Sequence, residues 1–171
     1  SPSFRRERAA AGRETRGIKR VHQFDKVELY RLVEPENSEA ALAELITDVE
    51  AVCRGLELPY RVLELCAGDL GFQSAQTYDI EVWAAGCQEW LEVSSISNCT
   101  DFQARRSGIR YRPSHGSRPI YPHTLNGSGL ALPRVLIALL ENNQQSDGSI
   151  ILPDTLVRYT GFKMIVPPAP A

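Results

Sequence analysis

Two stretches of the chain place apolar residues at the spacing of an amphipathic helix. After a break at Pro35, residues 38–55 carry an apolar side chain every three to four positions, and Gly55 is suited to end the helix. Its apolar stripe comprises Ala41, Leu42, Leu45, Ile46, Val49, Val52 and Cys53. Residues 130–143 repeat the pattern, and their apolar face comprises Val135, Leu136, Leu139 and Leu140. Each helix is therefore predicted to pack one face against a core.

Most of the remaining chain alternates with the period of a β-strand. Residues 20–33 form the longest such run, and Phe24, Lys26 and Glu28 lie together on its polar face. An aromatic ring is unusual on a polar face unless something stacks on it, so this face is predicted to be functional. Shorter strands are predicted at 60–66, 77–83, 90–97 and 120–126, and long loops at 7–19 and 100–117.

The order of these elements predicts the fold class. Strands outnumber helices, and the two helices are separated by several strands instead of alternating with them. This order favours an α+β fold in which helices pack on an antiparallel β-sheet. The sequence contains neither Gly-x-x-x-x-Gly-Lys-Ser/Thr nor Gly-x-Gly-x-x-Gly, so a P-loop or Rossmann nucleotide site is unsupported.

Charge is distributed unevenly, although the net charge is only −2. Basic residues gather in 1–20 and 101–118, whereas acidic residues gather in 34–50. Because the planar guanidinium suits phosphate, the arginine-rich stretches suggest phosphorylated ligands; solvated loop charge is the alternative for any single arginine. No apolar run approaches the ~20 residues that span a bilayer, and the start of the chain has no apolar signal segment. A cytoplasmic protein without a membrane partner is expected.

Activation of a carboxylate by ATP needs donors for the phosphates, a flat surface for the adenine and oxygen ligands for magnesium. The chain offers candidates for these parts, and for a group that holds an ammonium or hydroxyl: Arg5 and Arg134, Phe24, Glu92 with Ser95, and Glu28. Such candidates have structural alternatives: Glu28 can form a cross-strand pair with Lys26, and Phe24 can belong to the core. Ser128, a further polar residue, can cap the helix that follows it. Composition alone does not choose between these interpretations.

Longer motifs resemble, in the same order, those of the seryl-tRNA synthetases, a class II aminoacyl-tRNA synthetase family. The matching blocks are motif 2 at about 3–33 with Phe4-Arg5-Arg6-Glu7, the block Gly68-Asp69-Leu70-Gly71-Phe72 followed by 77–83, the block at 92–106, and motif 3 at about 124–142 with Asn126-Gly127-Ser128-Gly129. The resemblance implies part of a class II catalytic domain, an antiparallel sheet flanked by helices, at 1–162. A Pro/Ala-rich tail would follow at 163–171.

The resemblance also implies roles for individual residues. Two arginines would be catalytic, Arg5 at the α-phosphate and the serine carboxylate, and Arg134 at the γ-phosphate. The other ATP contacts would come from Arg6, Glu7, Val21, Phe24, Glu92, Val93, Ser94 and Ser95. Among these, Val21 and Phe24 would line the adenine pocket, while Glu92 and Ser95 would bind Mg²⁺ together with ATP. L-Serine would contact Arg5, Glu28, Asn126 and Ser128.

By resemblance, the chain is expected to be the catalytic part of a serine–tRNA ligase, which converts L-serine to seryl-adenylate with ATP and Mg²⁺ and transfers it to tRNA(Ser). Family members are homodimers, and their tRNA-binding arm and motif 1 are not present in these 171 residues. We therefore expect an N-terminally truncated domain that is poorly active alone. Two alternatives stay open: a ligase that charges a carrier protein, and a degenerate fragment that binds nucleotide or nucleic acid without turnover.

Overall fold

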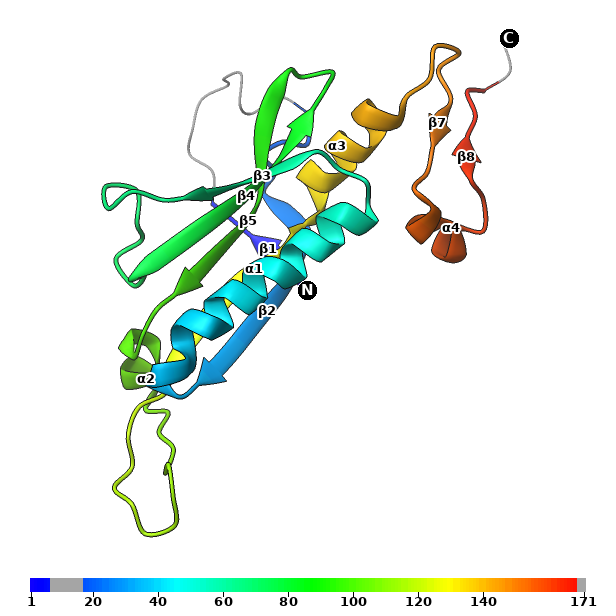
Figure 1. The fold of residues 1–171 in the computed structure, drawn as a ribbon. Coiled ribbons are helices and arrows are strands. Elements are labelled where there is room, and N and C mark those ends of the chain that lie inside the picture. The colour runs from blue at the N-terminus through cyan, green and yellow to red at the C-terminus, as the bar shows by residue number, and fades with distance from the viewer. Residues whose placement is uncertain (7–16, 169–171) are drawn as a thin grey trace.

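The computed structural model describes residues 1–6 and 17–168, which contain a six-stranded antiparallel sheet and helices packed on it (Figure 1). Along the chain the elements are β1 (Pro2–Phe4), β2 (Gln23–Val33), η2 (Pro35–Asn37), α1 (Ser38–Gly55), β3 (Tyr60–Glu64), β4 (Gln76–Ala84), β5 (Glu89–Asn98), α2 (Phe102–Ser107), β6 (His123–Ala131) and α3 (Leu132–Asn143). The strand order across the sheet is β1-β2-β6-β5-β4-β3. This arrangement confirms the predicted α+β class.

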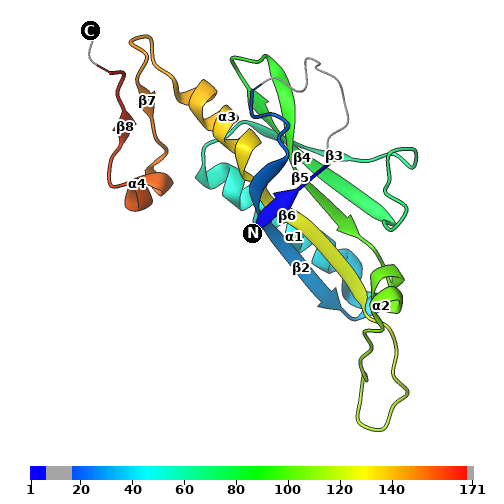
Figure 2. The same ribbon diagram turned by 180° about the vertical axis from the view of Figure 1, so that it is seen from behind.

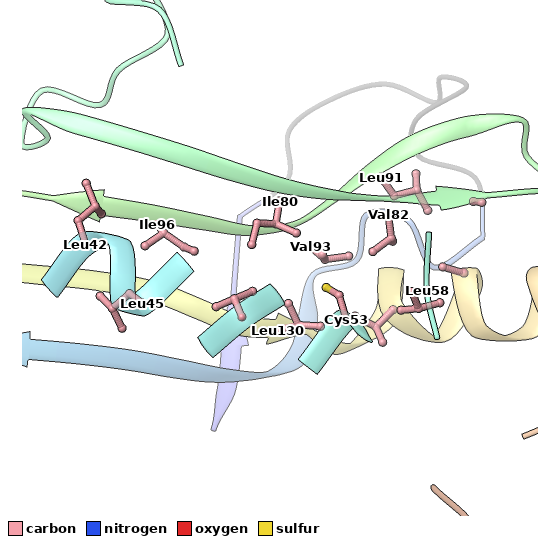
Figure 3. Close-up of a cluster of buried hydrophobic side chains, with 14 of the residues drawn as sticks. Leu42, Leu45, Cys53, Leu58, Ile80, Val82, Leu91, Val93, Ile96 and Leu130 are labelled. Atoms are coloured by element: carbon pink, nitrogen blue, oxygen red, sulfur yellow. The ribbon is translucent and has the colours of Figure 1, made fainter. Parts of the chain in front are cut away.

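The hydrophobic core lies between one face of the sheet and the two long helices, as Figure 3 shows for its central part. Leu45 and Val49 of α1 and Ala138 of α3 pack against Ile80 of β4 and Ile96 of β5, and all five are almost fully buried. Because side chains alternate along a strand, the opposite face of the sheet carries the polar positions. That second face is left free of both helices and is the one that carries the site.

The positions of the two helices are predicted correctly, but their predicted apolar stripes include residues that are exposed. Val52 of α1 is 40% exposed and Leu136 of α3 is 47% exposed, whereas Ala138, which is absent from the predicted stripe, is fully buried. Ala138 belongs to the core cluster that α3 forms with the sheet. Sequence periodicity did not distinguish it from the larger apolar residues beside it.

Two segment predictions differ from the structure. The expected loop at 100–117 contains the helix α2, whose Ala104 is buried against the sheet. The strand expected at 120–126 begins at His123 and continues through three residues of small side chain to Ala131. The loop expected at 7–19 falls largely on residues 7–16, which lie outside the described residues.

Gly127 lies inside β6 at a position where a side chain has no room. A Cβ added at Gly127 would lie 2.8 Å from Cγ1 and 3.3 Å from Cα of Ile96 on the neighbouring strand. We expect Gly127→Ala to lower the free energy of unfolding by about 1–3 kcal/mol, since overpacking forces β5 and β6 apart. Chemical denaturation checks this against Gly68→Ala, whose added Cβ meets nothing within 4 Å. Equal stability of the two variants would contradict the close approach.

A small C-terminal unit stands beyond the end of α3 (Figures 1 and 2). It consists of β7 (Ile150–Ile151), α4 (Asp154–Thr160) and β8 (Met164–Ile165), and β7 pairs with β8 in an antiparallel two-stranded sheet. β8 belongs to the stretch that the sequence assigned to the tail. Among the described helices, none combines the length and the apolar character that crossing a membrane requires.

Candidate functional site

A cleft of about 360 Å³ opens on the sheet face that the helices leave free. Its walls come from the ends of β1 and α3 and from the central strands β2, β5 and β6. Ten of the predicted site residues line it: Arg5, Val21, Phe24, Glu28, Glu92, Val93, Ser95, Asn126, Ser128 and Arg134. Residues separated by more than a hundred positions in the sequence therefore share one cavity.

One end of the cleft, the arginine end, is formed by Arg5, Phe24 and Arg134. The guanidinium carbon of Arg5 lies 5.0 Å from the centre of the Phe24 ring, so the cation covers part of the aromatic face. Arg5 is placed there because its backbone N–H donates to the carbonyl of His22 at 2.9 Å, which continues the pairing of β1 with β2. A flat ring beside a cation is a surface suited to a nucleobase with attached phosphate.

Arg134 is fixed by contacts to two other segments. Its Nη1 donates to the backbone carbonyl of Glu92 at 2.7 Å, and its Nε donates to the carbonyl of Lys19 at 3.1 Å. The carboxylate of Glu92 lies 3.8 Å from the same guanidinium. A guanidinium held by backbone carbonyls loses little further freedom when it binds an anion, and its remaining N–H groups stay available.

The other end of the cleft, the carboxylate end, is formed by Glu28, Asn126 and Ser128. Glu28 and Ser128 are paired across β2 and β6, and Asn126 Nδ2 donates to Glu28 Oε1 at 3.2 Å. Lys26 Nζ lies 2.8 Å from Glu28 Oε2, and because both residues belong to β2 this ion pair lies within one strand; the cross-strand pair expected as an alternative is not formed. The Glu28 side chain is still 34% exposed, so it keeps lone pairs directed to the cleft for a small ligand.

The floor of the cleft on β4 and β5 is made of small polar residues. Thr77 and Ser97 share a buried hydrogen bond of 2.8 Å, and Ser95 is paired across the strands with Asp79. One Asp79 oxygen, Oδ1, is buried without a hydrogen-bond partner among the described residues. Burial raises the pKa of the Asp79 carboxyl, the Ser95 hydrogen bond lowers it, and the Glu92 charge raises it further.

These oxygens decide whether a magnesium ion fits. Carboxylate and hydroxyl oxygens are the ligands that Mg²⁺ prefers, and Glu92 and Ser95 supply them to the cleft. Asp79, with its unpartnered Oδ1, lies opposite Ser95 on β4 but does not line the cleft. Among the described residues, no three His, Cys, Asp or Glu side chains gather closely enough to hold a metal alone. The donor set therefore fits a cation that takes most of its ligands from phosphates and water.

Two predicted residues within the described part of the chain do not line this cleft, and a third cannot be placed. Arg6 is exposed and does not line it. Ser94 is 1% exposed and turns to the core side of β5, where its hydroxyl donates to the Ser128 carbonyl at 2.6 Å. Ser94 thus supports the carboxylate end from behind. Glu7 lies outside the described residues.

Other cleft residues escaped the sequence reasoning. Lys26, Thr77 and Ser97 also line the cleft. Lys26 and Ser97 each lie two positions from a predicted site residue on the same strand, so strand periodicity could have indicated them. Lys19 and Gln73 come from segments outside the regular strands and helices, where no periodicity indicates direction. The position of a loop side chain depends on the tertiary fold, so local sequence does not predict that it lies in the cleft.

Comparisons with known proteins identify the family and the fold. Residues 1–143 match the family model of the tRNA synthetase class II core domain (G, H, P, S and T). A serine–tRNA ligase of Thermomicrobium roseum is 60% identical over all 171 residues, which is 100% of this chain and 38% of that protein. This chain therefore spans little more than a third of the relative that it matches.

Two solved structures have the same fold over nearly the whole chain. Seryl-tRNA synthetase from Pyrococcus horikoshii complexed with ATP superposes with a TM-score of 0.93 at 48% identity, covering 98% of this chain and 37% of that one. Cytoplasmic serine–tRNA ligase from Naegleria fowleri in complex with AMP gives a TM-score of 0.89 at 37% identity, covering 97% and 40%. These likenesses confirm the resemblance that the sequence motifs predicted.

Proposed function

The chain belongs to the family of class II tRNA synthetase core domains, and on that premise we propose that its cleft activates L-serine with ATP as the catalytic part of a serine–tRNA ligase. The observation that carries the proposal is the convergence of two guanidinium groups, Arg5 and Arg134, on one cleft with the Phe24 ring and the Glu28 carboxylate. The relatives named for serine, and the neighbours solved with ATP or AMP, support the choice of ligands.

At the arginine end, the adenine stacks on Phe24 beside Val21. Arg5, next to the ring, holds the α-phosphate and the serine carboxylate that attacks it, so that the two reacting groups meet in line. Arg134, at the same end of the cleft, holds the γ-phosphate. Both guanidinium groups offset the negative charge that grows on the phosphate oxygens during attack.

Magnesium would be held by Glu92 and Ser95, with Asp79 behind them. When bound, the ion supplies charge neutralisation of the phosphates and makes pyrophosphate a better leaving group. The chain's own part is to position oxygens. Arg134 fixes the β5 backbone at Glu92 through the 2.7 Å hydrogen bond, which keeps that carboxylate at the edge of the cleft.

At the carboxylate end, Glu28 binds the ammonium or hydroxyl group of serine, while Asn126 and Ser128 form the walls of a small pocket. A pocket whose polar groups bond a substrate hydroxyl rejects an analogue without it, because those groups would be left unpaired. The activated serine is then transferred to tRNA(Ser). We assign this catalytic domain to residues 1–162, with motif 2 at about 3–33, motif 3 at about 124–142 and the tail at 163–171; in the whole protein we propose a homodimer.

A pair of non-hydrolysable adenylate analogues, seryl and alanyl, tests the proposal by isothermal titration on the 171-residue chain. We expect the seryl analogue to bind more tightly, and Glu28→Gln to weaken it by about tenfold or more, the usual worth of a hydrogen bond to a charged group. ATP affinity should be unchanged in this variant. Glu39→Gln on the exposed side of α1 is the matched control. Equal affinity for both analogues would refute the assignment of serine.

The two alternatives use the same cleft and differ in the ligands that they accept. A degenerate fragment would bind ATP without preferring the seryl over the alanyl analogue, so the same titration separates it from a ligase. Transfer of the activated serine to a carrier protein or to tRNA(Ser), measured on a protein that includes the tRNA-binding arm, separates the two ligases.

A further inference from the structure

A network of polar contacts joins the arginine end of the cleft to the hairpin that β4 and β5 form. It starts from α3, where Arg134, Ala138 and Glu141 follow one another at four- and three-residue spacing and therefore share one face of the helix. Ala138 is buried in the core, and a charged residue lies on either side of it. Arg134 is bonded to β5 beside the cleft, whereas Glu141 contacts the turn of the hairpin.

Glu141 anchors this turn with both oxygens of its carboxylate. Oε2 accepts from the backbone N–H groups of Gly86 and Cys87, each at 3.0 Å, and Oε1 accepts from the Cys87 thiol at 3.0 Å. The hydrogen bond to Glu141, together with burial, raises the pKa of the Cys87 thiol, so the thiol stays protonated and donates at neutral pH. A Cβ added at Gly86 would lie 3.0 Å from Cδ of Glu141. The turn is therefore held directly against the end of α3.

Glu89, the first residue of β5, connects the anchored turn to the segment that precedes β2. Its Oε1 forms an ion pair with the ammonium of Lys19, whose side chain is only 20% exposed. Removing one partner of a partly buried ion pair leaves the other charge uncompensated, so the two side chains constrain each other. The Lys19 ammonium is thus directed to the hairpin, and its charge is already offset by Glu89.

The backbone of Lys19 completes the network at the cleft. Its carbonyl accepts from Nε of Arg134 at 3.1 Å, while Nη1 of the same arginine donates to the carbonyl of Glu92 at 2.7 Å. The contacts form a closed ring that runs from α3 through Glu141, the turn, Glu89 and Lys19 to Arg134 and back to α3. Lys19 lies outside the regular strands and helices, so its position depends on contacts of this kind.

We propose that Lys19 and Glu89 are positioning residues of the ATP site: their ion pair sets the Lys19 carbonyl, and this carbonyl directs the Arg134 guanidinium to the γ-phosphate. The inference rests on the proposed function in one respect, that Arg134 binds this phosphate. Because the pair acts through Arg134, it affects the binding of ATP and leaves AMP unaffected. If Lys19, which lines the cleft, instead bound a phosphate itself, neutralising Glu89 would free the ammonium and strengthen ATP binding.

Isothermal titration of ATP and AMP into the 171-residue chain tests the proposal. Lys19→Met and Glu89→Gln should each weaken ATP binding by about threefold to about tenfold, less than loss of the arginine itself, and should leave AMP affinity unchanged. Combining Lys19→Glu with Glu89→Lys restores an ion pair of reversed polarity and should recover most of the ATP affinity. The matched control is Glu44→Gln on α1, which breaks an ion pair with Arg31 away from the cleft lining.

Three results would overturn the proposal: Glu89→Gln leaves ATP affinity unchanged or raises it, ATP and AMP weaken together, or the reversed pair binds ATP as weakly as the single variants. A carboxylate at position 19 repels phosphates, so a lysine that contacted them directly would give the last result. Joint weakening of ATP and AMP would mean that the pair only supports the segment before β2.

The same titrations in an Arg134→Ala chain keep this inference separate from the proposed function. Adding Glu89→Gln to that chain should have no further effect on ATP affinity, since the pair acts only through the arginine. If Arg134→Ala weakens ATP binding and Glu89→Gln alone does not, the positioning role fails while the proposed function stands. If ATP does not bind the unaltered chain, or Arg134→Ala leaves its affinity unchanged, the proposed function fails whatever Glu89→Gln does.

Discussion

Replacing Arg134 with alanine is expected to weaken ATP binding by about tenfold to about a hundredfold, because a charged donor to the γ-phosphate is lost from a partly enclosed site. The side chain is 25% exposed and is directed by its bonds to the carbonyls of Lys19 and Glu92. Few other positions in the cleft combine a full charge with such fixed geometry. Isothermal titration of ATP into the variant measures the effect.

Titration of AMP distinguishes the two roles that Arg134 has in the structure. AMP lacks the β- and γ-phosphates, so its affinity should stay close to that of the unaltered chain if Arg134 acts on the γ-phosphate. If the arginine served only to tie Lys19 to β5, then ATP and AMP would weaken together. Arg158→Ala on α4, a residue that does not line the cleft, provides the control for loss of one positive charge.

Leu45→Ala is expected to lower the free energy of unfolding by about 2–5 kcal/mol, the range for removing a fully buried leucine. Leu45 is 1% exposed and belongs to the core that α1 forms with the sheet (Figure 3). A loss of this size is a large part of the stability of an ordinary domain. Urea denaturation followed by circular dichroism measures it.

Leu136→Ala is the matched control for that experiment, since this leucine of α3 is 47% exposed. Its replacement should change the free energy of unfolding by about 0.5 kcal/mol or less, as for most surface positions. Similar losses in the two variants would mean that α1 is not packed on the sheet as described. The helix stripes would then need a different partner.

The helices and strands were largely predictable, because the spacing of their apolar residues can be recognised in the local sequence. The alternation of 77–83 and 90–97 gave β4 and β5 nearly to their ends, and the stripe from Ala41 to Cys53 gave α1. β6 was predicted too short because glycine at 127 and 129 signals a turn in isolation. In the structure Gly127 is required by Ile96 on the next strand, which local sequence does not reveal.

The site was predictable only through motifs shared with a family. No local rule brings Arg5 and Arg134 together, because their approach depends on strand order across the whole sheet. The residues that were missed show the same limit: Gln73 lies in an irregular segment, and its contact with Gln103 exists only after α2 packs beside β6.

The central claim is that ATP lies on the open face of the sheet, and a crystal structure of the chain with ATP tests it most directly. We predict the adenine against the Phe24 ring and the triphosphate between the guanidinium groups of Arg5 and Arg134. A nucleotide bound elsewhere, or one whose phosphates contact neither arginine, would contradict the account.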